Sequence, residues 1–202
     1  SASSAPASDV VLITVNKTPP AATASATSST ICSGAATTLN ATGANAYSWA
    51  PVAMSGASIS VNPTSSTTYT VTGTGSNGCT STAIKLINVN ALPSVGSTAT
   101  FNTLCEGGST TLTGTGANIY TWNFGATYTN TITVTPPSTT TYAVIGTNTA
   151  TGCTNISTRT INVNPLPVLN ISASPSSICP GSASTLSVNG ASTYSWQPGS
   201  FT

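Results

Sequence analysis

A pattern of cysteine, glycine, leucine and tryptophan occurs three times along the chain. The copies begin at Cys32, Cys105 and Cys179, which are 73 and 74 residues apart. In every copy a leucine follows the cysteine by 7 residues and a tryptophan follows it by 17. Self-similarity at a fixed period indicates a chain built from one repeated structural unit. The fold must therefore be sought for a unit of about 73–74 residues.

Proline-containing junctions divide the chain at the same period, at Thr18-Pro19-Pro20, Ala91-Leu92-Pro93 and Pro165-Leu166-Pro167. Because proline has no N–H to donate to a strand ladder, a strand must stop at each junction. We predict four segments: the closing strand of a preceding repeat (1–17), a first repeat (18–91), a second repeat (92–165) and the first half of a third repeat (166–202). The third repeat is expected to be completed either by a longer chain or by a neighbouring chain.

Within a repeat, the structured stretches have the period of β-strands. Ser58–Asn62 and Thr68–Thr72 alternate apolar and polar residues, which is typical of half-buried strands. Gly75-Ser76-Asn77-Gly78 then indicates a hairpin turn into the closing strand, which ends at Asn90. Six or seven short strands per repeat predict an all-β fold of tandem immunoglobulin-like antiparallel β-sandwiches.

The aromatic side chains have fixed places in the repeat. A tryptophan that follows a tyrosine at i−2 on a strand facing a core is expected to fill that core. Stacking on a sugar ring is the alternative for these tryptophans. The tyrosines that open the next-to-last strand resemble the tyrosine corner, which ties a loop to the sheet, and are expected to be structural. The predicted core aromatics are Trp49, Trp122, Trp196, Tyr69 and Tyr142.

The five cysteines are spaced as two pairs and one remainder. Cys32 and Cys79 are separated by 47 residues and Cys105 and Cys153 by 48, so we predict the disulfides Cys32–Cys79 and Cys105–Cys153. Each would stabilise its repeat by roughly 4 kcal/mol and implies an oxidising compartment. Cys179 has no predicted partner in this chain. Metal binding is the alternative, but the chain has no histidine and only two carboxylate side chains to complete such a site.

The charged residues are too few for several classes of function. The chain has three Lys or Arg, two Asp or Glu, and no His, for a net charge of +1. Without histidine there is no conventional Ser-His-Asp or Cys-His arrangement, and Asp9 and Glu106 lie in different segments. Scattered cations form no basic patch for nucleic acid, and no run of roughly 18 apolar residues predicts membrane insertion. We expect no enzymatic activity, no metal and no other cofactor.

Linked motifs at fixed spacing give the chain a family resemblance. They are Cys-x-Gly, Thr-Leu, Gly-Ala-x-x-Tyr-x-Trp, Thr-Thr-Tyr-x-Val, Gly-Cys and Asn-Val-Asn-x-Leu-Pro. In this pattern the chain resembles the tandem immunoglobulin-like (PKD-like) repeats of large secreted and cell-surface proteins of Bacteroidota, many of them adhesins. The resemblance implies export to the cell surface and a place in a stalk or fibre.

We therefore expect a non-enzymatic structural stalk segment of an extracellular bacterial surface protein. Its partners would be other repeats of the same protein or identical chains, and the sequence identifies no glycan or surface ligand. A self-assembling filament subunit completed by a neighbouring chain is one alternative. Carbohydrate-binding accessory modules of a secreted hydrolase are another, for which Phe101, Phe124 and Tyr128 are the uncommitted aromatic side chains.

Overall fold

The computed structural model describes residues 13, 15, 18–124 and 129–197, and all regular structure in them is β. Two compact units can be distinguished. One comprises the chain as far as Leu92 together with Asn148–Cys153, and the other comprises Pro93–Thr147 and the chain from Thr154 onward. The predicted all-β fold is confirmed.

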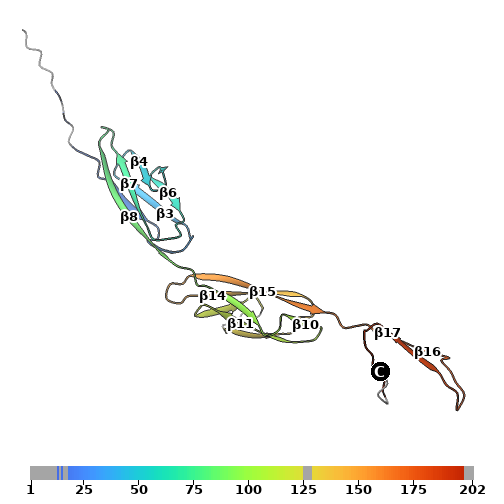
Figure 1. The fold of residues 1–202 in the computed structure, drawn as a ribbon. Coiled ribbons are helices and arrows are strands. Elements are labelled where there is room, and N and C mark those ends of the chain that lie inside the picture. The colour runs from blue at the N-terminus through green and yellow to red at the C-terminus, as the bar shows by residue number, and fades with distance from the viewer. Residues whose placement is uncertain (1–12, 14, 16–17, 125–128, 198–202) are drawn as a thin grey trace, which may run out of the picture. The chain divides into compact units, whose positions relative to one another are not determined.

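The first repeat consists of two sheets (Figure 1). The smaller sheet has the antiparallel order β1-β3-β6, with strands Thr23–Ala26, Thr37–Thr42 and Ser58–Val61. The larger sheet has the order β2-β8-β7-β4-β5, with strands Thr30–Cys32, Thr80–Asn90, Thr67–Thr74, Ala46–Ala50 and Met54–Ser55. All its pairings are antiparallel except that of β2 with β8.

The second repeat has the same plan. Its smaller sheet has the order β13-β11-β9, with strands Thr131–Val134, Thr110–Thr115 and Gly96–Ala99. Its larger sheet has the order β10-β15-β14-β12, with strands Thr103–Cys105, Thr154–Asn164, Thr140–Thr147 and Ile119–Trp122. The pairing of β10 with β15 is parallel, like that of β2 with β8.

Each of these repeats has one core, filled by inward-facing residues of both of its sheets. Because side chains alternate across a strand, every second residue is buried in β3 and, from Tyr69 onward, in β7. The core of the first repeat contains Leu39, Trp49, Val71 and Ile87, and that of the second contains the corresponding Leu112, Trp122, Val144 and Ile161. Burial of these apolar side chains is the main force that holds the two sheets together.

In both repeats the chain crosses from the smaller sheet to the larger one just before its cysteine-bearing strand. A buried threonine hydroxyl supports each crossing. Thr37 accepts from the Ser28 N–H and donates to the Ser28 carbonyl, at 3.2 and 2.9 Å. Thr110 does the same with Phe101, at 2.9 and 3.0 Å. These bonds replace ladder hydrogen bonds that the backbone loses where it leaves the first sheet.

The described part of the third repeat contains a two-stranded antiparallel sheet, β16 (Asn170–Ser174) and β17 (Thr185–Asn189). Its apolar side chains are largely exposed, as Ile171 at 67% and Leu186 at 56% illustrate. Trp196 is half-buried.

Candidate functional site

A disulfide joins Cys32 of the first repeat to Cys153 of the second, across 121 residues of sequence and with 5.6 Å between the two Cα atoms. Cys32 ends β2, and Cys153 is the last residue of the turn between β14 and β15. The predicted pairs Cys32–Cys79 and Cys105–Cys153 are therefore wrong, although two of their four cysteines do form a bridge.

The geometry of the closing strand explains why a repeat cannot bridge its own two cysteines. Cys32 pairs with Asn90, the last residue of β8, whereas Cys79 immediately precedes Thr80, the first. The 11 residues of β8 span roughly 33 Å at the usual rise of a strand. A disulfide requires Cα atoms less than about 7 Å apart, so these two residues cannot be joined.

The second repeat has the same arrangement. Cys105 pairs with Asn164 at the end of β15, whereas Cys153 precedes Thr154 at its start. Cys105 and Cys179 are free thiols, and both are exposed. Cys79 is half-buried and takes no part in the disulfide.

The predicted core aromatics lie at corresponding places in the two sandwiches. Trp49 and Trp122 are each 2% exposed, which leaves no face for stacking on a sugar. Their indole N–H groups donate to the carbonyls of Gly56 and Thr129, at 3.0 and 3.2 Å. The buried polar atom of each indole thus has a partner, as buried polar groups require.

Tyr69 and Tyr142 are also buried, at 3% and 2% exposed. Burial raises the pKa of both hydroxyl groups above the ordinary value for tyrosine, because the phenolate would lose its hydration. Each packs in the core of its own repeat.

Different tyrosines tie a loop to the sheet, and sequence reasoning missed them. The Tyr47 hydroxyl accepts from the Ala44 N–H and donates to the Ala44 carbonyl, both at 2.8 Å. The Tyr120 hydroxyl does the same with Ala117, at 2.9 and 2.8 Å. The signal was the Gly-Ala-x-x-Tyr motif itself, which holds the alanine and its tyrosine at i+3.

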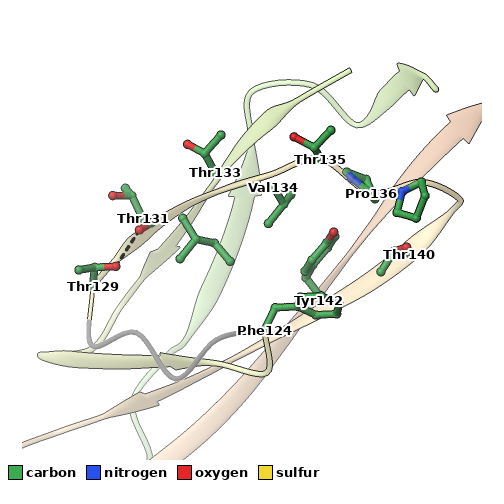
Figure 2. A pocket seen from close by; sticks show the side chains of 11 residues that line it. Phe124, Thr129, Thr131, Thr133, Val134, Thr135, Pro136, Thr140 and Tyr142 are labelled. Carbon is green, nitrogen blue, oxygen red and sulfur yellow. Dashed lines mark hydrogen bonds between the residues drawn. The ribbon is translucent and has the colours of Figure 1, made fainter. Parts of the chain in front are cut away.

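The second repeat has an open pocket of about 600 Å³ beside β13 (Figure 2). Phe124, which is 59% exposed, meets the ring of Tyr142 edge to face with 5.4 Å between the centroids. β13 lines the opposite side of the pocket, and in Figure 2 its Val134 side chain points toward the two rings, whereas the side chains of Thr133 and Thr135 point away from them. Phe101 is equally exposed but does not line the pocket, and Tyr128 lies outside the described residues.

The charged side chains of the described chain form no reactive cluster. Arg159 donates to the Ser97 carbonyl and thereby connects β15 to β9 of the smaller sheet. Within residues 18–124 and 129–197, no group of three His, Cys, Asp or Glu could hold a metal ion. The same residues contain no helix with the length and hydropathy needed to cross a membrane.

Neither the protein-family models nor the curated protein sequences contain a match to this chain. Among solved structures, the chain is similar to murine CEACAM1b, with 13% identity, a TM-score of 0.32, and coverage of 72% of this chain and 100% of the other. An adhesin with which an Antarctic bacterium binds ice, described as Ca²⁺-stabilised, matches at 12% identity and a TM-score of 0.38, covering 77% of this chain and 52% of that one. Three N-terminal domains of the bacteriophage RB49 outer capsid protein Hoc match at 16% identity and a TM-score of 0.33, covering 75% and 61%. The chain thus spans about half to three fifths of the latter two solved chains, and likenesses this distant carry no functional argument.

Proposed function

We propose that this chain is a non-enzymatic structural segment of an extracellular bacterial surface protein, in which cross-linked immunoglobulin-like repeats act as a semi-rigid spacer. The observation that carries the proposal is the Cys32–Cys153 disulfide. It gives the first and second repeats a second covalent connection in addition to the peptide chain. A disulfide of this kind also fits a protein that functions in an oxidising compartment outside the cytosol.

Both ends of the disulfide lie close to the peptide connection between the repeats. Cys32 pairs with Asn90, and the next residue, Ser33, donates its N–H to the Asn90 carbonyl at 2.9 Å. Asn155, two residues after Cys153, donates its side-chain amide to the Pro93 carbonyl at 3.0 Å. A joint with two covalent attachments can rotate less than a single peptide linker, so the disulfide favours a stiff spacer.

The composition supports the same role. With three cations and two carboxylates in 202 residues, the chain has few groups whose interactions salt or pH could change. The resemblance to surface repeats of Bacteroidota adhesins supports a role for such a spacer in the stalk of an exported protein, where it would hold a distal element away from the cell.

The stiffness of the joint can be measured by double electron–electron resonance. Spin labels on non-cysteine handles would replace the exposed Ser65 and Ser138, one in each repeat. We expect a narrow distance distribution in the oxidised chain and a distinctly broader one in the double variant Cys32→Ser/Cys153→Ser. The matched control, Cys105→Ser/Cys179→Ser, keeps the disulfide and should keep the narrow distribution. Equal widths with and without the disulfide would contradict the spacer proposal.

The pocket beside β13 favours a second candidate function, binding of a carbohydrate. The exposed Phe124 ring and several threonines line one open space, and sugar sites commonly combine an apolar platform with polar groups that fix orientation. This is one aromatic platform in one repeat, so we rank it second.

A glycan array separates the two candidates. The spacer proposal predicts no glycan that binds the full chain above background. Binding that is lost in Phe124→Ala and retained in Phe101→Ala would instead establish the pocket as a carbohydrate site. Phe101 is the suitable control because it is as exposed as Phe124 and lies outside the pocket.

A further inference from the structure

Cys105 occupies in the second repeat the place that Cys32 occupies in the first. Both end a three-residue strand that runs parallel to the last three residues of the closing strand, and their partners are Asn164 and Asn90. The residue after each cysteine donates its N–H to that same asparagine carbonyl, in both cases at 2.9 Å. The two backbone settings are the same, yet Cys32 is bridged and Cys105 is an exposed thiol.

We propose that Cys105 is the attachment point for a disulfide to the turn cysteine of the repeat that follows, the residue that corresponds to Cys153. The bridge between Cys32 and Cys153 would then be one step of a series in which each repeat is cross-linked to the next. This inference rests on the same disulfide as the proposed function, and it names the partner of a second site.

A bridge within the second repeat cannot satisfy Cys105. Cys153 lies at the other end of β15, roughly 33 Å away by the rise of its 11 residues, and its sulfur is already bonded to Cys32. The partner must therefore come from outside the second repeat. The known bridge shows what kind of residue this partner is. Cys32 is bonded to a cysteine that ends a Gly-Cys turn, immediately before a closing strand.

The reaction is the oxidation of two thiols. Cys105 and the turn cysteine each give up a proton, and together they give up two electrons as the sulfur–sulfur bond forms. A small-molecule disulfide such as oxidised glutathione accepts the two electrons and two protons and leaves as two thiols. Thiol–disulfide exchange of this kind proceeds through a mixed disulfide with one of the protein cysteines.

The test supplies the missing turn to the full chain. A copy of residues 129–165 appended after Thr202 places a turn cysteine 74 residues beyond Cys153, the offset that separates Cys105 from Cys179. After oxidation in a glutathione buffer, peptides from a non-reducing digest are identified by mass spectrometry. We expect Cys105 linked to the appended cysteine and Cys32 linked to Cys153. Replacing the appended cysteine with serine should make Cys105 fully reactive toward iodoacetamide.

A second extended chain is needed because the composite third repeat of the first one could fail to fold. Residues 1–165 followed by a second copy of 92–165 offer the same turn cysteine within a repeat of natural sequence. If Cys105 stays alkylatable in both extended chains while Cys32–Cys153 forms, the inference is wrong and the spacer proposal stands. If the Cys32–Cys153 disulfide does not form either, both this inference and the spacer proposal are wrong.

A third arm uses the unextended chain with Cys32→Ser, which frees Cys153. We expect Cys105 and Cys153 to remain separately alkylatable, because they lie at opposite ends of β15. A Cys105–Cys153 bridge within one chain would overturn the inference.

Discussion

A Cβ atom added to Gly116 would overlap the carbonyl oxygen of Ser94, because the turn into β12 passes directly against the backbone before β9. Gly43 stands in the same relation to Ala21, and Gly190 to Val168. All three glycines have a positive φ, of 84, 90 and 109°. This contact recurs in each repeat. Only glycine both adopts the positive φ at this position and fits the space, because it has no Cβ atom.

Gly116→Ala is therefore expected to destabilise the second repeat strongly. The positive φ alone costs about 1–2 kcal/mol, and the overlap with Ser94 must be relieved by moving backbone. Gly107→Ala is the matched control, since Gly107 has a φ of 82° but nothing within 4 Å of the added atom. Thermal unfolding should show a clearly larger fall in the midpoint for Gly116→Ala. Equal falls would mean that the contact with Ser94 does not constrain the fold.

Tyr120→Phe should remove two hydrogen bonds and leave the core intact. The lost hydroxyl satisfies the N–H and the carbonyl of Ala117, so we expect a cost of about 1–2 kcal/mol. Tyr47→Phe should cost a similar amount in the first repeat, since the contacts of Tyr47 with Ala44 are the same. Denaturant unfolding of the two variants measures both costs. If neither change lowered the free energy of unfolding, the hydrogen bonds of these hydroxyls would be no better in the folded protein than those they make with water.

Alkaline pH should destabilise the protein through Tyr69 and Tyr142. Burial raises the pKa of both hydroxyls in the folded chain, so the unfolded chain ionises first. Their contribution to stability is complete below the ordinary tyrosine pKa of about 10. It is lost as the pH rises from there through the folded-state pKa. In Tyr69→Phe/Tyr142→Phe the unfolding midpoint should fall less between pH 9 and pH 11 than in the unmodified chain. An unchanged pH profile would contradict this assignment.

Salt should have little effect on stability, since the chain has five charged side chains in all. Between 10 mM and 1 M NaCl we expect the thermal midpoint to move by no more than about 2 °C, because screening changes only the few interactions between charges. The Arg159→Gln variant tests whether the bond to the Ser97 carbonyl depends on charge. A fall in the midpoint of many degrees at high salt would show that electrostatic interactions contribute more than the composition indicates.

The all-β fold was predictable from sequence because local signals determined it. From Tyr69 onward, β7 alternates buried and half-buried residues with period 2, and the Trp49 position recurs at Trp122. The three-residue strand β2 was not predicted, because three residues are too short to show a period. Its partner residues Asn88–Asn90 lie far along the chain, so no short stretch of sequence predicts the pairing.

That missed strand also explains the wrong disulfides. Spacing alone assigns Cys32 and Cys79 to one repeat. Only the register of β2 on β8 shows that the two cysteines lie at opposite ends of β8. Disulfide connectivity cannot be deduced from spacing, since four cysteines already allow three pairings. The pocket beside Phe124 was equally beyond prediction, because it depends on how β13 and the Tyr142 ring lie in space.

The central claim, that a disulfide cross-links the two repeats, is tested most directly by pulling the chain from its two ends. The variant Cys79→Ser/Cys105→Ser excludes both predicted bridges within a repeat and retains Cys32 and Cys153. The disulfide encloses a 121-residue span, which an oxidised chain cannot extend. At about 3.3–3.6 Å per residue, complete unfolding should therefore release roughly 400 Å less contour length before reduction than after it. The same contour length in both states would contradict the cross-link and the spacer built on it.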